Sequence, residues 1–471
     1  MNSILKGMNT ILIRDGLLVE ANRSWHADIL IEGEKISRVE SRIDLDGLPK
    51  DTTIVNAEGM CILPGLIDAH THYHLVSRGT VTADSFAEGS RAAAFGGVTT
   101  VIDFADHDKE KPLVASSEER IKAMEEGMEV DFALHQGVYG IPKNLKEELR
   151  SVKERGITAL KIFTTYKDVG YLIEQEGLKE LFEAAKELNL LVSIHCEDDT
   201  LIEKVGKNYK GDYKAGDHPL LRPAEAEYKA IMAMGELAKE VDIPIYIVHL
   251  SSARGLEAVR TLRAQGVTLM VETTPHYLLL DDSYLEGEEA PLYVMTPPLR
   301  SKKDKLILQD ALVAKEIQVV ATDHCTFTKE QKGASKDCRT IYPGVPGTEE
   351  LLPLIHTFAV ASGRMSLSHM VRLLSTAPAK TFGLYPQKGS LEVGSDADIV
   401  IFDSEHLWTL SATNLHSAAG YTPYEGFKVV GKAIMTYLRG RLIVGDDIYL
   451  GKRGSGKFVE AQESLVFKGF R

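Results

Sequence analysis

The chain has 471 residues, of which 44% are hydrophobic and 26% are charged, and its formal net charge is −14. These proportions are typical of a water-soluble globular protein, and the length is sufficient for two or three domains. Because an acidic chain is repelled by phosphate-rich surfaces, we expect neither nucleic acid nor a membrane as its partner.

Targeting signals and disulfides are not expected either. Residues Met1 to Thr10 lack the apolar segment of a secretory signal, and no run approaches the ~20 apolar residues that cross a bilayer. The four cysteines include no Cys-x-x-Cys pair. The sequence therefore predicts a cytoplasmic protein without a disulfide framework.

Both ends of the sequence alternate apolar and polar residues between turn signals. The pattern fills residues 10–63 and returns over 386–450. A period of two predicts β strands, which we expect to be short and antiparallel. We therefore predict one small β-sandwich formed by residues 1–63 and 386–450, followed by a polar tail at 451–471 that is either peripheral or in contact with a partner.

The middle of the chain, residues 64–385, has a different rhythm. Eight apolar runs predict strands: Gly65–His72, Val98–Phe104, Val130–Tyr139, Ile157–Phe163, Leu190–His195, Ile243–Leu250, Val267–Thr273 and Ile317–Thr322. Amphipathic helical patterns lie between them, among them Glu176–Leu188, Pro223–Glu240, Gly255–Ala264 and Lys303–Lys315. Strands alternating with helices predict an α/β fold, a TIM-like (β/α)8 barrel with its active site at the carboxyl ends of the strands. The connections 197–222 and 325–348 exceed ordinary loop lengths, so we expect them beside that site.

The carboxyl ends of these runs carry metal-ligand side chains. Alternate residues of a strand point to one side, so His70 and His72 are expected to project together. Later runs bring further ligand types to the same ends, His195, His249 and Asp323, together with one lysine, Lys161. One histidine at a strand end is usually structural, and Asp323 alone could cap a helix. Several such residues at one barrel mouth predict a metal site.

Lys161 stands in the apolar run Ala159–Phe163, where an ammonium group is costly to bury. Its stem could extend to the rim and keep the charge in water. Alternatively, CO₂ could add to the amine and give a carbamate, an anion that can bridge two metal ions ~3.5–4 Å apart.

Several stretches resemble one known family. They are Pro64–His72, Thr80–Phe86, Leu160–Lys167, Glu272–Leu280, Tyr293–Arg300 and Gly344–Gly347. Together they resemble the hydantoinase/dihydropyrimidinase branch of the metal-dependent amidohydrolase superfamily. The resemblance implies two divalent metal ions, with zinc expected and manganese or cobalt as alternatives. It also implies a carboxylated Lys161 (N6-carboxylysine) and a homotetramer or dimer. The metal ligands of that family match the six candidate residues.

The resemblance also implies a reaction on a small cyclic substrate. A hydroxide bridging the two metal ions would open a hydantoin or a 5,6-dihydropyrimidine to an N-carbamoyl amino acid. Asp323 would move the proton, and Tyr166 would stabilise the oxyanion. Thr296 and Pro343 would hold the substrate ring. The branch usually has serine at the position of Thr296 and often has asparagine at that of Pro343. Pro343 can hold the ring only through its carbonyl, because proline has no N–H.

The remaining candidates have lesser expected roles. We place His74 at the rim or behind the ligands, and we treat His276 and His324 as structural or supporting groups. We interpret Cys196 and Cys325 as small apolar neighbours of the site and not as ligands.

Three other functions compete with this interpretation. Hydrolysis of another cyclic ureide, as by an allantoinase, stays open. Dihydroorotases usually have an arginine soon after the two histidines, where it binds the substrate carboxylate. A dihydroorotase is less favoured here, because Tyr73 to Leu75 follow the two histidines and Arg78 is further along. Non-catalytic scaffold proteins of the same fold lose metal ligands, whereas this chain keeps all six, and the metal content of the protein would separate these classes.

Overall fold

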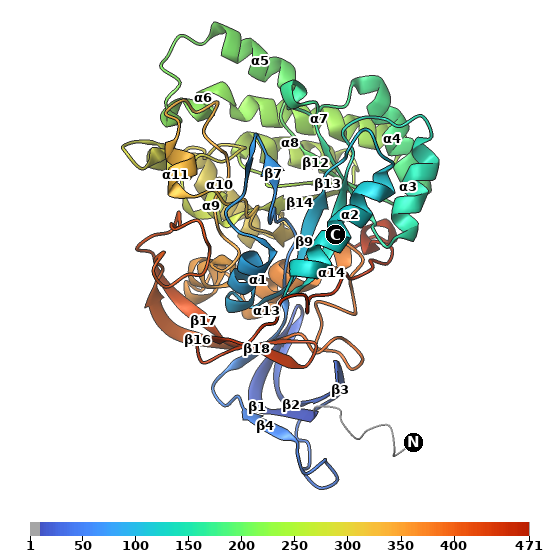
Figure 1. Ribbon diagram of the computed structural model, residues 1–471, viewed down its shortest axis with the longest axis vertical. Coiled ribbons are helices and arrows are strands. Elements are labelled where there is room, and N and C mark those ends of the chain that lie inside the picture. The colour runs from blue at the N-terminus through green and yellow to red at the C-terminus, as the bar shows by residue number, and fades with distance from the viewer. Residues whose placement is uncertain (1–9, 471) are drawn as a thin grey trace.

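The computed structural model describes residues 10–470. The prediction that Met1 to Thr10 carry no secretory signal therefore lies outside the described residues, except for Thr10. Figure 1 shows two parts, a helix-covered barrel and a smaller sheet packed against one end of it. Among the described residues, no helix is both long enough and apolar enough to cross a membrane.

Eight parallel strands form the barrel, in the order in which they occur along the chain. They are β6 (Leu66–Asp68), β9 (Val98–Ala105), β10 (Asp131–Gly137), β11 (Ala159–Phe163), β12 (Leu191–His195), β13 (Ile245–Ile247), β14 (Leu269–Thr273) and β15 (Val319–Val320). A parallel bridge between Thr71 and His324 joins the segments that follow the first and last strands. The predicted (β/α)8 barrel is confirmed.

The helices cover the outside of this barrel (Figure 1). The longer ones are α1 (Phe86–Phe95), α2 (Leu113–Gly127), α3 (Leu145–Glu154), α4 (Gln175–Glu187), α5 (Asp199–Asn208), α7 (Ala224–Val241), α8 (Ala253–Ala264) and α10 (Lys302–Val313). The short ones are α6 (His218–Leu221), α9 (Pro275–Leu279), α11 (Lys329–Gly333), α12 (Leu351–Ile355), α13 (Leu367–Val371) and α14 (Ala377–Thr381).

Local sequence explains where these helices begin and which face they bury. The Ser252 side chain caps α8 by accepting a hydrogen bond from the Gly255 N–H. Leu256, Val259 and Leu262 follow at helical spacing and are all buried. The predicted helix Gly255–Ala264 therefore ends where expected and starts two residues earlier, at the cap.

The smaller part is a nine-stranded sheet that combines both ends of the described chain. Its amino-terminal strands are β1 (Thr10–Glu20), β2 (Arg23–Glu32), β3 (Lys35–Glu40), β4 (Thr53–Asn56) and β5 (Cys61–Pro64). Its carboxyl-terminal strands are β16 (Ile399–Thr409), β17 (Lys428–Leu438), β18 (Arg441–Gly445) and β19 (Ile448–Tyr449). The two groups meet where β5 pairs antiparallel with β16. The expectation of antiparallel pairing throughout is wrong for β4 and β5, which run parallel to β1.

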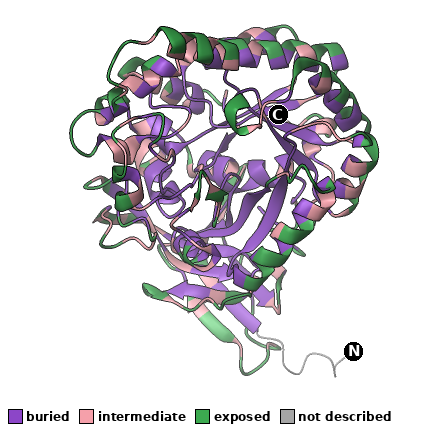
Figure 2. Cartoon of the chain, turned by 45° about the horizontal axis from the view of Figure 1, so that its top comes forward, coloured by how far each residue is buried: buried purple, intermediate pink, exposed green. Residues whose placement is uncertain are grey.

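The barrel is closed at the end opposite its mouth. Small and apolar side chains fill the interior, and Phe382, Val459 and Val466 belong to the same buried cluster. Residues 451–470 take part in this closure: the Phe132 N–H donates to the Lys457 carbonyl at 3.0 Å. The polar segment expected to be peripheral or in contact with a partner thus packs against the start of β10. Figure 2 shows the strands at the centre of the barrel as buried.

A buried ion cluster connects the two parts. Lys388, 1% exposed, lies 2.5 Å from Asp131 of the barrel and 2.7 Å from Asp398 of the sheet domain. Arg439, between β17 and β18, contacts the same Asp131 at 3.0 Å. This cluster fixes the orientation of the sheet relative to the barrel.

Candidate active site

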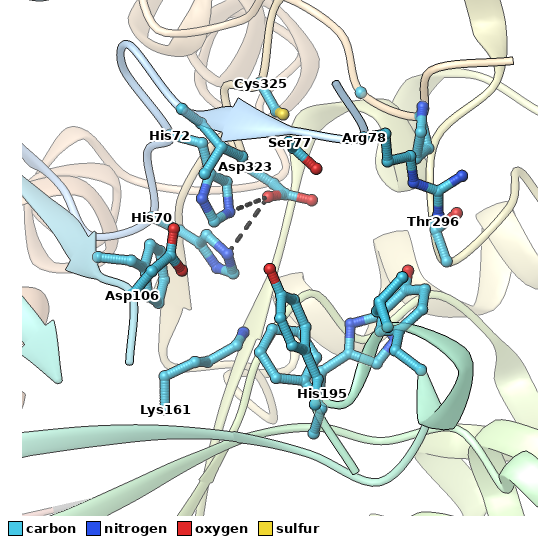
Figure 3. A pocket seen from close by; sticks show the side chains of 18 of the residues that line it. His70, His72, Ser77, Arg78, Asp106, Lys161, His195, Thr296, Asp323 and Cys325 are labelled. Atoms are coloured by element: carbon cyan, nitrogen blue, oxygen red, sulfur yellow. Dashed lines mark ion pairs between the residues drawn. The ribbon is translucent and has the colours of Figure 1, made fainter. Parts of the chain in front are cut away.

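A cavity of about 290 Å³ lies at the carboxyl ends of the barrel strands. All six residues predicted as metal ligands line it, together with the predicted substrate contacts Tyr166, Thr296 and Pro343. Figure 3 shows the labelled members of this set around one space, with Lys161 opposite His72 and Asp323. The structure therefore brings together the six predicted metal ligands and the three predicted substrate contacts.

The two leading histidines follow β6 and are not part of it. The hydrogen-bonded strand ends at Asp68, and the chain then continues extended, with the His72 N–H donating to the His324 carbonyl at 2.8 Å. The rings of His70 and His72 nevertheless lie 5.2 Å apart on the same side. Asp68 stabilises this segment by accepting hydrogen bonds from the Thr322 N–H at 3.0 Å and the Thr348 hydroxyl at 2.9 Å.

His70, His72 and Asp323 form the tightest group. One oxygen of Asp323 lies 3.2 Å from Nε2 of His70 and 3.3 Å from Nε2 of His72 (Figure 3). Burial opposes ionisation of Asp323, but the neighbouring imidazoles hold the pKa of its carboxyl below the usual value. The ligand atoms of these three residues lie within 4.8 Å of one another, close enough to hold one metal ion.

Glu272 orients two of the histidines and is one of the residues that sequence reasoning missed. It accepts hydrogen bonds from Nδ1 of His70 at 2.9 Å, from the His249 N–H at 3.1 Å and from the Tyr246 hydroxyl at 2.8 Å. Burial raises its pKa to about 8, while these hydrogen bonds and the charge of Lys161 act in the opposite direction. A charged residue inside the apolar run Val267–Thr273 was the available signal.

Glu197 does the same for the next histidine. Its carboxylate lies 2.7 Å from Nε2 of His195 and 2.6 Å from Arg222. Burial opposes ionisation of Glu197, but Arg222 holds its pKa well below the usual value. With Nε2 engaged, Nδ1 of His195 is the nitrogen left for the cavity. This pairing could not be predicted from the sequence, because Arg222 comes from the far end of a long connection.

Lys161 projects from β11 into the cavity and is 1% exposed. Its Nζ lies 5.2 Å from the Phe104 ring centre and 5.1 Å from that of Phe163. Within residues 10–470, no hydrogen-bond acceptor or carboxylate pairs with this Nζ. Burial lowers the pKa of Lys161 to about 8, only partly offset by the charges of Asp323 and Glu272. The alternative in which its stem extends to the rim does not hold.

Known proteins match this architecture. The sequence model of the Amidohydrolase family matches residues 61–443. The chain belongs to the amidohydrolase family. It is 37% identical to a D-hydantoinase from Geobacillus stearothermophilus over 96% of each chain. It is 32% identical to a dihydropyrimidinase from Dictyostelium discoideum over 96% of this chain and 90% of the other. Among solved structures, a dihydropyrimidinase from Brevibacillus agri superposes with a TM-score of 0.93 at 35% identity, covering 96% and 99% of the two chains.

The donor set of this amidohydrolase suits the metal ions on which the family depends. Imidazole binds a metal ion only when it is neutral, and burial lowers the pKa of His70, His195 and His249. Carboxylates are hydrogen-bonded to Nδ1 of His70 and to Nε2 of His195. Such a hydrogen bond fixes the tautomer of a ligand histidine. His70, His72 and Asp323 thus form a possible metal site in which the chemistry of the donors fits a divalent ion such as zinc.

Several residues at the mouth have left-handed backbone. Tyr166 has a φ of 65°, His249 of 39° and Asp323 of 51°. The half-buried Tyr166 packs its ring 5.3 Å from that of His195, and Arg222 lies 5.0 Å from its centre. Burial raises the pKa of its phenol, so the hydroxyl is a hydrogen-bond donor at neutral pH.

The loops that carry Thr296 and Pro343 are held by one buried lysine. Nζ of Lys332, on α11, donates to the carbonyls of Val294 at 2.7 Å, Tyr342 at 3.0 Å and Gly344 at 2.7 Å. This interaction brings the two predicted substrate contacts together from separate connections.

The lesser candidates divide between structural roles and the surface. His324 is buried, hydrogen-bonded to Asp84 at 2.8 Å and to two backbone N–H groups, and is therefore structural. His276 is buried beside Tyr277. His74, expected at the rim, is exposed, lies 5.4 Å from the Phe86 ring and does not line the cavity. Cys196 and Cys325 are buried thiols whose pKa values burial raises.

Proposed function

We propose that this amidohydrolase opens the ring of a hydantoin or a 5,6-dihydropyrimidine, giving an N-carbamoyl amino acid. The observation that carries the proposal is the meeting of four imidazoles, Lys161 and Asp323 at one barrel mouth. The identities of 32–37% to a dihydropyrimidinase and a D-hydantoinase over nearly the whole chain support the same chemistry. The protein is a cyclic amidohydrolase.

The residues that would hold two divalent ions are those that share the mouth: His70, His72, Lys161, His195, His249 and Asp323. When bound, the ions supply the Lewis acidity that activates a water near neutral pH and polarises an amide carbonyl. Zinc fits this set of nitrogen and oxygen donors best, and manganese and cobalt are the alternatives.

Lys161 would take part as a carbamate. The ammonium first gives one proton to solvent, and the neutral amine nitrogen then attacks the carbon of CO₂. An N–C bond forms, one C=O π bond becomes a C–O⁻ single bond, and the nitrogen gives a second proton to solvent. The product is an anion with two oxygens where the unmodified chain has a cation. Three features support this modification: Lys161 is buried, its Nζ has no polar partner among the described residues, and burial lowers its pKa to about 8.

The remaining residues handle the proton and the substrate. Asp323 takes a proton from the attacking water and delivers it to the ring nitrogen as the C–N bond breaks. The Tyr166 hydroxyl donates a hydrogen bond to the oxygen that becomes negative in the tetrahedral species. Thr296 and Pro343 would hold the ring through their backbone, and Pro343 can only accept.

The assembly and location of the protein are part of the same proposal. We infer a homotetramer or a dimer in the cytoplasm. The four cysteines, all buried and free, are compatible with a reducing compartment. Light scattering coupled to gel filtration measures the mass in solution, and a monomer would contradict the expected assembly.

The experiment combines a metal analysis with a panel of substrates. Purified protein should contain about two equivalents of zinc, manganese or cobalt per chain. It should release N-carbamoyl amino acids from hydantoin or dihydrouracil, and both enantiomers of a 5-substituted hydantoin would establish its stereochemical preference. The control is the same protein stripped by a chelator and then reloaded. Metal-loaded protein that opens allantoin but neither of the first two substrates would overturn the proposal in favour of an allantoinase.

A further inference from the structure

A β-hairpin beside the cavity has an unusual residue at its tip. Strands β7 (Val76–Ser77) and β8 (Thr80–Val81) pair antiparallel, and Arg78 and Gly79 form the two-residue turn. Their φ angles of 50° and 78° are both left-handed, as in a type I′ turn. Such turns favour asparagine, aspartate or glycine, and a bulkier residue there is strained by about 1–2 kcal/mol. The turn therefore carries an arginine at a position that would be less strained without it.

This arginine lies at the mouth of the active site. Arg78 lines the catalytic cavity and also an adjoining outer cavity of about 540 Å³. Figure 3 shows it next to Thr296, across the cavity from His70 and His72. Its charge is close enough to Tyr166 and Cys325 to lower their pKa values against the larger effect of burial. A substrate ring held near Thr296 would therefore lie beside Arg78.

The other arginines around the outer cavity are already paired. Arg222 is bound to Glu197 at 2.6 Å, and Arg339 is paired with Asp337 while stacking 3.5 Å from the Tyr213 ring centre. Among residues 10–470, Arg78 has only a long hydrogen bond of 3.4 Å to the Arg339 carbonyl. In the part of the chain that the structure describes, no carboxylate forms an ion pair with Arg78.

Several anionic groups of the two cavities have other partners, and among the described residues none forms an ion pair with Arg78. Asp106 accepts a hydrogen bond from the Tyr139 hydroxyl at 2.6 Å and lies on the opposite side of the cavity in Figure 3. Asp199 accepts one from the Thr165 hydroxyl at 2.9 Å, and Glu203 pairs with Lys207 at 2.5 Å. Asp168 lines the outer cavity as well. The side of the mouth nearest Thr296 is thus the one that offers an unpaired cation.

We propose that Arg78 binds a carboxylate on the ring substituent of the substrate, so that the preferred substrates are cyclic amides with an anionic side chain. The inference rests on the proposed ring-opening function and specifies its substrate class. The guanidinium can form two parallel hydrogen bonds to a carboxylate, whereas a neutral substituent of the same shape cannot use the charge.

The test compares two pairs of substrates, each pair consisting of a charged acid and its neutral amide. Hydantoin-5-acetic acid and hydantoin-5-propionic acid are each compared with their primary amides in metal-loaded protein, and kcat/KM is measured for each. Because Arg78 is exposed at the rim, we expect the acid to be favoured over the amide by about three- to tenfold. The preference should weaken as salt is raised, since salt screens exposed charges.

Three variants make the comparison decisive. Arg78→Asn suits the left-handed turn and removes the cation, so the acid-to-amide ratio should fall to about one. Arg78→Lys should keep part of the preference. Arg339→Gln, the matched control, removes a paired arginine of the same cavity and should retain the wild-type ratio.

Each outcome has a distinct meaning. A ratio that Arg78→Asn changes by less than about twofold, or a wild-type preference for the amide, would overturn the inference while leaving the proposed function intact. The same holds if the protein opens hydantoin but neither the acids nor the amides. Metal-loaded protein that opens no cyclic amide at all would overturn the proposed function and this inference together.

Discussion

The residues that line the cavity include four with left-handed backbone: Arg78, Tyr166, His249 and Asp323. Each such conformation costs a non-glycine residue on the order of 1–3 kcal/mol, and it persists only where the surroundings enforce it. At His249 the enforcing contact is the hydrogen bond from its N–H to Glu272. Strain of this kind commonly accompanies functional sites, because it aims a side chain that a regular strand would direct elsewhere.

The first prediction concerns Lys161→Ala. Removing the buried amine removes the proposed carbamate, so both metal content and activity should fall by more than about tenfold. Because the missing group is a carboxylate in effect, added acetate or propionate should restore part of both. Metal analysis and turnover, with and without the acids, provide the measurement. The exposed Lys179→Ala is the control, and full metal content in Lys161→Ala would refute the bridging role.

The second prediction concerns Tyr166→Phe. Loss of one oxyanion donor should lower kcat by about 10²–10³-fold with a smaller effect on KM, because the interaction forms only as charge develops. Metal content and Tm should stay at wild-type values. Tyr171→Phe is the matched control, since this ring lines the same cavity 6.4 Å from Tyr166. A fall in kcat of less than about fivefold in Tyr166→Phe would contradict the assigned role.

Sequence reasoning succeeded at this scale for side chains whose type alone is informative. A lysine in an apolar run and histidines at strand ends are conspicuous. It missed Glu272, Glu197 and Arg222, because their importance depends on which histidine each contacts after folding. It also missed the left-handed residues, since backbone strain is imposed by tertiary contacts and leaves no mark in composition.

At the scale of elements, all eight predicted barrel strands exist, but several end early. His70 follows β6, His249 follows β13 and Asp323 follows β15. Apolar residues continue beyond the last hydrogen bond between neighbouring strands, because these segments are buried whether or not they pair with a neighbour. Helix ends were predicted more closely, because caps such as Ser252 act locally. Helix α5 was not expected, since the connection 197–222 has no extended apolar stripe.

The third prediction concerns α11, which locks two loops. Lys332→Met would leave the carbonyls of Val294, Tyr342 and Gly344 without their donor in a buried setting. The free energy of unfolding should fall by about 2–4 kcal/mol, and KM should rise by about tenfold as Thr296 and Pro343 lose their alignment. Thermal melts and steady-state kinetics measure the two effects.

The control for α11 is the exposed Lys329→Met on the same helix, which should melt within about 1 °C of the wild type. The metal content of Lys332→Met should be unchanged, since within residues 10–470 its ammonium group donates to backbone carbonyls and not to a predicted ligand. A Lys332→Met protein with wild-type KM would show that the loops do not depend on this side chain.

For the whole molecule, the sequence predicted that a barrel would interrupt a β domain built from both ends. It could not predict that β4 and β5 run parallel to β1, because pairing direction depends on partners far apart in the chain. Nor could it predict the contact of Lys388 with Asp131 and Asp398, which meet only when barrel and sheet dock. Patterns within a segment were readable, whereas the direction of strand pairing and the side-chain contacts between distant segments were not.

The fourth prediction concerns pH and global stability. Glu350 is buried where α12 meets the sheet domain, and it accepts a hydrogen bond from Thr422 at 2.8 Å. Burial, with a contribution from Glu349, raises its pKa to about 7 from an ordinary value of 4.5. Between these values the folded state holds more protons than the unfolded state. Stability should therefore fall as pH rises from about 4.5 to 7, by up to about 3 kcal/mol.

The side chain of Glu350→Gln is neutral at every pH, so this variant should not lose stability as the pH rises from about 4.5 to 7. In urea titrations it should be more stable than the wild type at pH 8 by about 2–3 kcal/mol and similar to it at pH 5. The exposed Glu286→Gln should follow the wild-type curve. A pH-independent difference between Glu350→Gln and the wild type would argue against titration of Glu350 as the cause.

The pairing of β5 with β16 has a consequence for biosynthesis. Residues 61–64 leave the ribosome early, whereas their partners at 399–402 are translated only after the whole barrel segment. At ~5–20 residues per second, this delay is roughly half a minute. During that time the nascent chain presents an unpaired, apolar strand edge, the kind of surface through which polypeptides aggregate. Rapid synthesis or early binding by a chaperone should therefore raise the yield of correctly assembled protein.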